Sequence, residues 1–459
     1  MGIGSAAVLR PGWAAPAGPV AIVGGGVAGL TAAYRLPSRD VPVELFEAAP
    51  RLGGRMFTKR DFNSDNMFVE LGGELIDTQH TAIMDLAKEL GLKLQNLLEG
   101  ETGHDFLWFE GRARSDEELL AGLRPVIARV AEDAAKLYDN DDAFTPFARQ
   151  LDQISLSGYL AEIPGVERWI IDFLLAAYEP EYGLDAAQLS CLNLVDFIDH
   201  DLSDGFSVFG ESDEAWRIHG GNGQLPEALA ARLQGRVPMH TGKRLNRIAL
   251  HEGKVQLTFH GEDAPREFAK VILTLPFTQL RKVDGIFDLP LSEEKAKAIR
   301  ELGYGQNVKV MRGFTSRIWR EQGGNGSAFA KLATFQNIWE TSRGQKGDSG
   351  ILTNLLGGRR AIDFRLQADE RDLKDIDTVF PGSAEAYDGH NAVMNWPKLP
   401  THQGSYSCPL PGQYTWIQAA AAAPECGGRL LFAGEHTSAD FCGFMNGAVE
   451  SGNRVSTEV

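Results

Sequence analysis

Two hydrophobic patterns alternate at the start of the chain. Residues 21–23 and 43–46 are short apolar runs, which is typical of buried strands. A helix is expected to begin near Val27, between the two runs. The order strand, helix, strand predicts a βαβ unit and therefore an α/β fold.

The pattern becomes helical between residues 111 and 216. Ser115 and Glu118 form a capping box, and apolar residues follow at intervals of three and four, as on one face of a helix. Such a stripe packs into a core more often than it lines a cofactor, so we interpret the segment as a helical insert. Its apolar positions are Leu119, Leu123, Val126, Ile127, Val130, Ala134 and Leu137, and residues 169–178 repeat the spacing.

The rest of the chain follows strand and helix patterns in turn. Strands are expected at residues 68–76, 244–250, 254–259, 271–275, 303–314, 328–339 and 430–435, and helices at 81–90, 220–233 and from Gly443 onward. The fold class is therefore α/β, with a Rossmann-type dinucleotide domain assembled from discontinuous segments, a mixed-sheet substrate domain and a helical insert. The expected ranges are 19–62, 217–288 and 425–459 for the first, 63–110 and 289–424 for the second, and 111–216 for the insert.

Composition narrows the class of protein. A chain of 459 residues that is 43% hydrophobic is long enough for two or three globular domains. A net charge of −17 argues against a nucleic-acid partner, and no stretch is apolar enough to span a membrane. The four cysteines and ten histidines show no metal-ligand spacing, so no metal is expected, while a disulfide stays open. Residues 1–18 resemble either the end of a trimmed export signal or a disordered leader, which leaves a cytoplasmic and an exported location open.

Candidate chemistry begins in the first βαβ unit. Gly24, Gly26 and Gly29 have the G-x-G-x-x-G spacing that lets a backbone approach a pyrophosphate. The helix that follows would direct its free amides toward the phosphates, and Glu47 ends the second strand where a carboxylate can accept hydrogen bonds from a ribose. Together these features predict a dinucleotide site, with Val27, Ala28 and Ala48 among its contacts.

Two further stretches resemble the FAD-dependent amine oxidase superfamily. Arg51, Gly53, Gly54 and Arg55 match its R-x-G-G-R motif, and residues 433–437 with 443–452 resemble its C-terminal signature. The resemblance implies bound FAD, with Glu435 near the ribityl and pyrophosphate groups and the amides near Met445 facing the flavin pyrimidine. It also implies cofactor contacts at Leu71, Gly72, Gly73, Leu245, Gly434 and Phe444.

Three residues favour an amine oxidase within this superfamily. Lys309 matches a lysine that holds a water near flavin N5, while Tyr406 and Phe444 match the two rings of an aromatic cage that guides an uncharged amine. A strand lysine that reaches solvent and ordinary core aromatics are the structural alternatives. Members with covalent FAD have a cysteine at the position of Ser405, so the resemblance implies non-covalent FAD.

The substrate class depends on one departure from the family pattern. The overall resemblance is to bacterial L-amino acid oxidases and flavin monoamine oxidases, but Glu74 stands where many L-amino acid oxidases have an arginine that binds the substrate carboxylate. Another cation is then needed for an amino acid. Arg217, Arg312, Arg317 and Arg343 are the candidates. Further substrate contacts are expected at Trp216, Trp339 and the Gly443 carbonyl, although both tryptophans could be core residues.

The leading hypothesis is an FAD-dependent L-amino acid oxidase that yields an imino acid and, with O2, hydrogen peroxide. The alternative is a monoamine or polyamine oxidase that acts on amines without a carboxylate, a substrate that suits Glu74, Asp77 and the acidic balance. A desaturase-like or porphyrinogen-oxidising flavoenzyme and a non-catalytic flavin-binding protein are the other hypotheses. The expected partners are a small amine or amino acid and O2, and a homodimer stays open.

Overall fold

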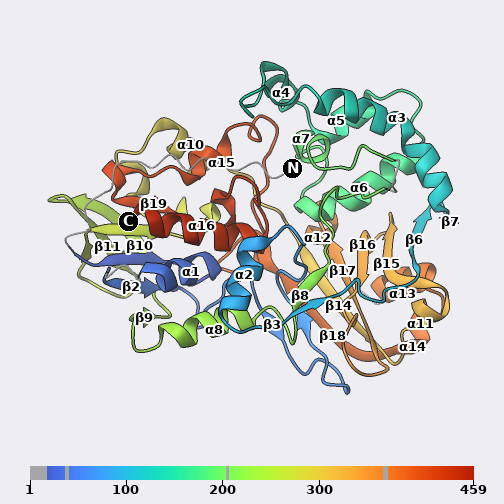
Figure 1. Ribbon diagram of the computed structural model, residues 1–459, viewed down its shortest axis with the longest axis horizontal. Helices are drawn as coiled ribbons and strands as arrows, with labels where there is room; N and C mark the ends of the chain where they lie inside the picture. The colour runs from blue at the N-terminus through green and yellow to red at the C-terminus, as the bar shows by residue number, and fades with distance from the viewer. Residues whose placement is uncertain (1–17, 37–40, 203–205, 365–370) are drawn as a thin grey trace.

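The chain folds into three parts that lie side by side (Figure 1). The computed structural model describes residues 18–36, 41–202, 206–364 and 371–459. The expected leader therefore lies outside the described residues, except for Gly18. In the described ranges, no helix is both long and apolar enough to cross a bilayer.

A parallel sheet joins three distant stretches of the chain. Its strand order is β19 (Leu430–Phe432), β13 (Lys270–Leu273), β1 (Val20–Val23), β2 (Val43–Phe46) and β9 (Met239–His240). All neighbouring pairs are parallel. This arrangement confirms the discontinuous Rossmann-type domain, because strands near residues 20, 270 and 430 lie beside one another.

Both faces of the parallel sheet are covered. Val20 and Ile22 of β1 pack in one cluster with residues of α1 (Val27–Arg35), α8 (Gln224–Leu233) and α16 (Met445–Glu458). Ala21 and Val23 face the opposite cluster, because side chains alternate along a strand. That second cluster includes residues of the antiparallel strands β10 (Leu245–His251), β11 (Lys254–Phe259) and β12 (Arg266–Phe268), and of α9 (Phe277–Leu280), α10 (Glu293–Glu301) and α15 (Ile417–Ala422).

The second part is built on a seven-stranded mixed sheet, as the alternation at residues 303–314 and 328–339 predicts. Its order is β18 (Tyr387–Asn395), β14 (Val308–Phe314), β17 (Gly350–Leu356), β16 (Asn337–Glu340), β15 (Gly324–Ala330), β6 (His104–Phe109) and β7 (Arg112–Arg114). Only β15 and β6 pair in parallel among these strands. The short helices α11 (Ile318–Glu321), α12 (Gly358–Asp363), α13 (Arg371–Val379) and α14 (Ser383–Ala386) belong to the same region of the chain.

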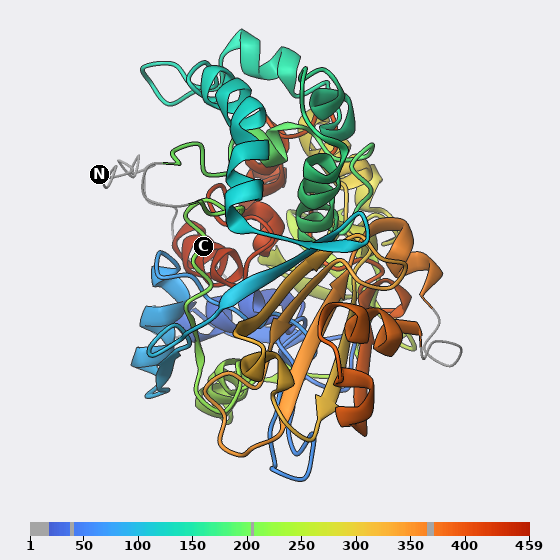
Figure 2. The ribbon, with the colours of Figure 1, turned by 90° about the vertical axis from the view of Figure 1, so that its right-hand side faces the viewer.

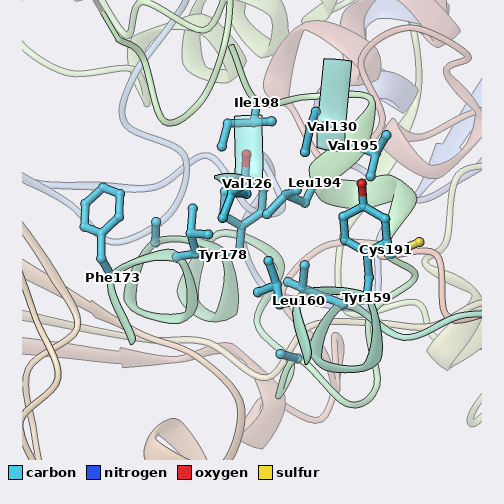
Figure 3. Packing of buried hydrophobic residues seen from close by; sticks show 14 of the residues in the cluster. Val126, Val130, Tyr159, Leu160, Phe173, Tyr178, Cys191, Leu194, Val195 and Ile198 are labelled. Atoms are coloured by element: carbon cyan, nitrogen blue, oxygen red, sulfur yellow. The ribbon is translucent and has the colours of Figure 1, made fainter. Parts of the chain in front are cut away.

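The third part is helical, and Figure 2 shows its helices above the mixed sheet. The Ser115 hydroxyl accepts from the Glu118 N–H and the Glu118 carboxylate accepts from the Ser115 N–H, so the capping box is confirmed at the start of α3. The apolar stripe packs inward, as Figure 3 shows for Val126 and Val130 among residues of α5, α6 and α7. The helices are α3 (Asp116–Ala134), α4 (Pro146–Leu151), α5 (Leu156–Ala161), α6 (Arg168–Tyr182) and α7 (Leu192–Val195).

One stretch departs from its sequence pattern. Of the expected strand at residues 68–76, only β4 (Val69–Glu70) forms, paired with β3 (Thr58–Lys59). The following residues leave the strand as a turn that brings Gly72–Glu74 to a cavity. Helix α2 (Thr81–Glu89) packs its buried residues in the cluster of α1 and α16. The strands β5 (Leu94–Asn96) and β8 (Trp216–Ile218) pair nearby.

Candidate active site

A cavity of about 630 Å³ lies where the three parts meet. The first βαβ unit and the start of α16 supply one group of lining residues, and β14, β16 and residues 401–409 supply another. Residues of the helical part, including Glu181 and Asn193, complete it. The cavity therefore joins the expected cofactor residues to the expected substrate residues.

The three motif glycines have different roles in the structure. A Cβ on Gly29 would lie 2.0 Å from the Gly24 carbonyl oxygen, so Gly29 lets α1 pack closely against β1 and does not line the cavity. A Cβ on Gly26 would meet no atom closer than 3.9 Å, and Gly26 does line the cavity. No side chain caps α1 at Gly26, which leaves first-turn amides, including those of Val27 and Ala28, available to an anion.

Glu47 lies at the end of β2, as expected for the ribose acid. Its carboxylate accepts from the N–H groups of Gly25 (2.6 Å) and Ala49 (2.7 Å) and lines the cavity beside Ala48. Burial raises the pKa of Glu47, and these two backbone donors partly offset that effect. Such a carboxylate, held in place by backbone donors, can receive ribose hydroxyls.

Glu435 ties the two ends of the chain together. Its carboxylate lies 2.9 Å from Arg55 Nη1 and also accepts from the Ser407 hydroxyl and the Gly443 N–H. Burial opposes its ionisation, but Arg55, His436 and the Ser407 hydroxyl together outweigh burial and hold the pKa of Glu435 below its usual value. The glycine turns Gly53 and Gly54, together with Arg51, Gly434 and Met445, line the same region.

Gly72 and Gly73 pass through a narrow gap beside the cavity. A Cβ on Gly72 would lie 1.7 Å from the Arg55 carbonyl oxygen, and one on Gly73 would lie 2.6 Å from Met445 Sδ. Glycine is therefore required for this close approach. The neighbouring Leu71 is buried and does not line the cavity.

Lys309 lines the cavity from β14 and is buried. Its ammonium donates to Glu74 Oε2 at 2.8 Å and to the Gly72 carbonyl at 3.1 Å, and it lies 5.3 Å from the centre of the Trp339 ring. Burial opposes ionisation of Glu74, but Lys309, the Thr341 hydroxyl and Arg217 together outweigh burial and hold the pKa of Glu74 below its usual value. Glu74, expected to contact substrate, is thus a cavity residue whose charge Lys309 neutralises.

Three aromatic residues expected at the substrate also line the cavity: Trp339, Tyr406 and Phe444. The Tyr406 hydroxyl donates to the Pro180 carbonyl at 3.0 Å, which ties the ring to α6. Gly443 lines the cavity directly before Phe444. The expected aromatic cage residues and the expected lysine therefore share one cavity.

Several expected contacts lie elsewhere. Trp216 does not line the cavity; its indole N–H donates to the Thr78 hydroxyl in the pairing that joins β8 to residues 76–78. Leu245 begins β10 and packs in the hydrophobic cluster on the far side of β1. Both residues therefore lie outside the cavity lining.

None of the four candidate arginines lines the cavity. Arg312 forms two hydrogen bonds with the Asp372 carboxylate. Arg217 is fully buried and donates to the carbonyls of Thr341 and Arg343, while Arg317 pairs with Glu340 and Arg343 with Glu101. Among the described lining residues, the lysines and arginines are Arg51, Arg55 and Lys309, and each has a polar partner.

Four carboxylates that sequence reasoning missed line the cavity: Glu181, Asp196, Glu214 and Asp440. The Asp196 carboxylate accepts from the hydroxyls of Tyr138 and Tyr414. Glu181 lies at the end of α6, and Glu214 lies on the loop before β8. Burial raises the pKa of Glu181 to about 7. Glu214 is exposed, and desolvation together with the nearby carboxylates of Glu181 and Asp77 raises its pKa to about 8. Glu181 interrupts an apolar helical stripe, which is a usable sequence signal. Glu214 lies in a polar loop and carries no such signal.

The comparisons with known proteins agree with this geometry. A family model described as flavin-containing amine oxidoreductase matches residues 27–459. The chain belongs to this family. Membership implies FAD as the cofactor and establishes that the protein is an amine oxidoreductase.

Relatives of this flavin-containing amine oxidoreductase differ in their named substrates. The L-amino-acid oxidase of Sistrurus catenatus edwardsii is 23% identical and covers 96% of this chain and 86% of its own. Polyamine oxidase 4 of Oryza sativa subsp. japonica is 24% identical over 96% of this chain and 88% of its own. A solved structure of wild-type putrescine oxidase bound to putrescine has a TM-score of 0.80 at 22% identity, covering 96% of this chain and 98% of its own, which shows a shared fold.

The residues present fit FAD. The open space at Gly26, the uncapped start of α1 and the acceptor Glu47 suit the adenosine and pyrophosphate half of the cofactor. The start of α16 at Met445 also lacks a side-chain cap, which leaves amides for the flavin carbonyls. Among the residues that the structure describes, no three His, Cys, Asp or Glu side chains group to hold a metal ion.

Proposed function

We propose that the protein oxidises amines that carry a second positive charge and no carboxylate, such as diamines or polyamines. The observation that carries this proposal is the charge of the cavity: Glu181 and Glu214 face it, whereas its described cations already have partners. A carboxylate substrate would meet repulsion there, and a second ammonium would find counter-charges. The proposal falls within the alternative hypothesis of the sequence analysis, a monoamine or polyamine oxidase. The charge of the cavity favours that hypothesis over an L-amino acid oxidase.

The residues of the chain would act on the two ends of such a substrate differently. Trp339, Tyr406 and Phe444 provide apolar surface that favours the neutral form of the reacting amine, since burial without a counter-ion disfavours the charged form. Glu74 neutralises Lys309, so the lysine adds no net repulsion. Glu181 and Glu214 would hold the distal ammonium. Bound FAD supplies the two-electron acceptor for the hydride of the carbon that bears the amine, and O2 restores it with release of hydrogen peroxide.

The FAD is proposed to be held without a covalent bond. Ser405 stands at the position where a cysteine would make a thioether, and its hydroxyl donates to Asn307 Oδ1. Acid precipitation of the holoprotein is expected to leave the flavin in the supernatant. Flavin that remains with the precipitate would contradict this part of the proposal.

The test uses substrates that differ by one group. Anaerobic stopped-flow reduction of the bound flavin is followed with 1,5-diaminopentane, pentylamine and L-lysine, which is the diamine with a carboxylate added. The diamine is expected to reduce the flavin at the lowest concentration, pentylamine to bind less tightly, and L-lysine, L-leucine and L-phenylalanine to give little reduction. Efficient reduction by the amino acids, with the diamine inert, overturns the proposal and restores the L-amino acid oxidase hypothesis.

Variants identify the carboxylates. Glu181→Gln and Glu214→Gln are each expected to raise the Kd of the diamine by about tenfold, because each removes one counter-charge of the distal ammonium. The Kd of pentylamine should change less than twofold. Glu211→Gln, on the same loop, exposed and outside the cavity lining, is the matched control. Equal effects on both amines would contradict the assignment.

A further inference from the structure

A buried acid and a buried histidine lie directly behind the substrate side of the cavity. Asp77 and His80 are each 2% exposed, and neither lines the cavity. The Asp77 N–H donates to His80 Nδ1 at 3.0 Å, and His80 Nε2 lies 3.3 Å from Asp77 Oδ2. His80 Nε2 makes no hydrogen bond despite this proximity, so the Asp77 N–H is the donor that holds the His80 ring.

Asp77 also holds the loop that carries Glu214. Its carboxylate accepts from the Ser212 hydroxyl at 2.7 Å and from the Glu214 N–H at 3.0 Å. Glu214 has a φ of 48°, a left-handed conformation that is costly for a residue other than glycine. Hydrogen bonds from the surroundings hold the loop in this conformation. One of them is the bond that the Glu214 N–H donates to the Asp77 carboxylate.

The same pair supports an aromatic wall of the cavity. The His80 ring lies 5.0 Å from the Phe444 ring and 5.2 Å from the Phe441 ring, measured between centroids. Phe444 lines the cavity, whereas His80 does not. His80 therefore backs Phe444 from the protein side, and removing it leaves space into which the Phe444 ring can move.

We infer that Asp77 and His80 are positioning residues: Asp77 sets the place of the Glu214 carboxylate, and His80 sets the place of the Phe444 ring. Neither touches the substrate. The Asp77 part rests on the proposed function, since it requires Glu214 to bind a distal ammonium. The His80 part requires only that Phe444 is a wall at the reacting amine. One short segment thereby aligns the charged and the aromatic contacts of a single substrate.

Double-mutant cycles on the holoenzyme test the two parts. Asp77→Asn should raise the Kd of 1,5-diaminopentane about tenfold and leave that of pentylamine within twofold, and this effect should vanish in a Glu214→Gln background. His80→Ala should lower the limiting rate of flavin reduction about tenfold for both amines and have no further effect in a Phe444→Ala background. His80→Gln replaces His80→Ala where the alanine variant does not fold.

The controls separate positioning from general damage. Tyr159→Phe removes a hydrogen bond to the buried carboxylate of Asp133, away from the cavity, and should leave both kinetic quantities unchanged. The inference is overturned if Asp77→Asn and His80→Ala change the Kd and the limiting rate of flavin reduction equally. It is also overturned if their effects add to those of Glu214→Gln and Phe444→Ala. If Glu214→Gln does not separate diamine from monoamine, the proposed function fails. If it does and Asp77→Asn does not, only the inference fails.

Discussion

At the scale of single residues, the cavity is defined by which charges have partners. Lys309 and Glu74 form a buried pair, so they contribute little net charge. Desolvation and nearby carboxylates, Asp77 among them, raise the pKa values of Glu181 and Glu214. The charge that these two groups offer to a substrate therefore becomes negative as pH rises through about 7 and 8.

Breaking the Lys309–Glu74 pair should destabilise the fold. Lys309→Met leaves a buried carboxylate without its counter-charge, and Glu74→Gln leaves a buried ammonium, each of which costs about 3–5 kcal/mol. The double variant removes both charges and should be more stable than the sum of the single effects indicates. Thermal unfolding of the four proteins at one pH checks this. Additive losses in the double variant would show that the two charges act independently.

The binding of a cation should depend on the ionisation of Glu181 and Glu214. Their pKa values of about 7 and about 8 lie above the ordinary value of 4.5, so both are largely protonated at pH 6 and ionised at pH 9. A bis-quaternary alkane carries a fixed charge, and its inhibition constant should fall about tenfold or more over this range, because one ion pair at 4 Å is worth about 4 kcal/mol at an effective dielectric constant of 20.

The double variant Glu181→Gln, Glu214→Gln should remove most of that pH dependence. The free energy of unfolding should change with pH in the direction opposite to inhibitor binding. A raised carboxylate pKa stabilises the folded state below pH 4.5, and this contribution is lost as pH rises through about 7 and 8. Thermal unfolding without the inhibitor follows this loss. If the inhibition constant of a neutral inhibitor of similar size changes with pH in the same way, groups other than Glu181 and Glu214 cause the pH dependence.

At the scale of elements, the first strand and helix separate packing from ligand approach. Gly29 fits α1 against β1, and Gly26 leaves open space at the cavity. Gly29→Ala should lower the thermal midpoint and the flavin content together, because its Cβ overlaps the Gly24 carbonyl. Gly26→Ala should keep the midpoint of the flavin-free protein and lose flavin affinity. Absorbance at the flavin band and thermal unfolding of the flavin-free protein distinguish the two outcomes, and equal behaviour of both variants contradicts the distinction.

Local sequence patterns predicted an element correctly where an interaction between residues close in the sequence determines its structure. The Ser115 capping box and the βαβ glycines depend on residues within a few positions of each other, and both formed as expected. Residues 68–76 did not, because Gly72 and Gly73 fit against Arg55 and Met445, which lie elsewhere in the sequence. Trp216 and Glu214 show the same limit: Glu214 lines the cavity and Trp216 does not, and contacts with residues 76–78 hold both. The family pattern located the cavity, but the long-range contacts decide which charges face it.

At the scale of the whole molecule, Glu435 links segments that are hundreds of residues apart. Its partners Arg55, Ser407 and Gly443 lie in the first βαβ unit, in a loop of the substrate part and before α16. Glu435→Gln removes the charge that pairs with Arg55 and should raise the Kd for FAD about tenfold or more, given that hydrogen bonds to charged groups are worth about 1.5–3 kcal/mol. Flavin release on dilution measures it. Glu450→Gln, on α16 and outside the cavity lining, should retain flavin.

The strand order β19, β13, β1 has a consequence for biosynthesis. Strand β1 leaves the ribosome early, but its neighbour β13 follows about 250 residues later and β19 later still. The backbone groups of residues 20–23 that pair with β13 therefore stay unpaired until most of the polypeptide has been translated. Because Gly434, Glu435 and Met445 line the cavity, flavin should bind only after these residues have been made. A nascent chain arrested before residue 430 should therefore be colourless and dependent on chaperones.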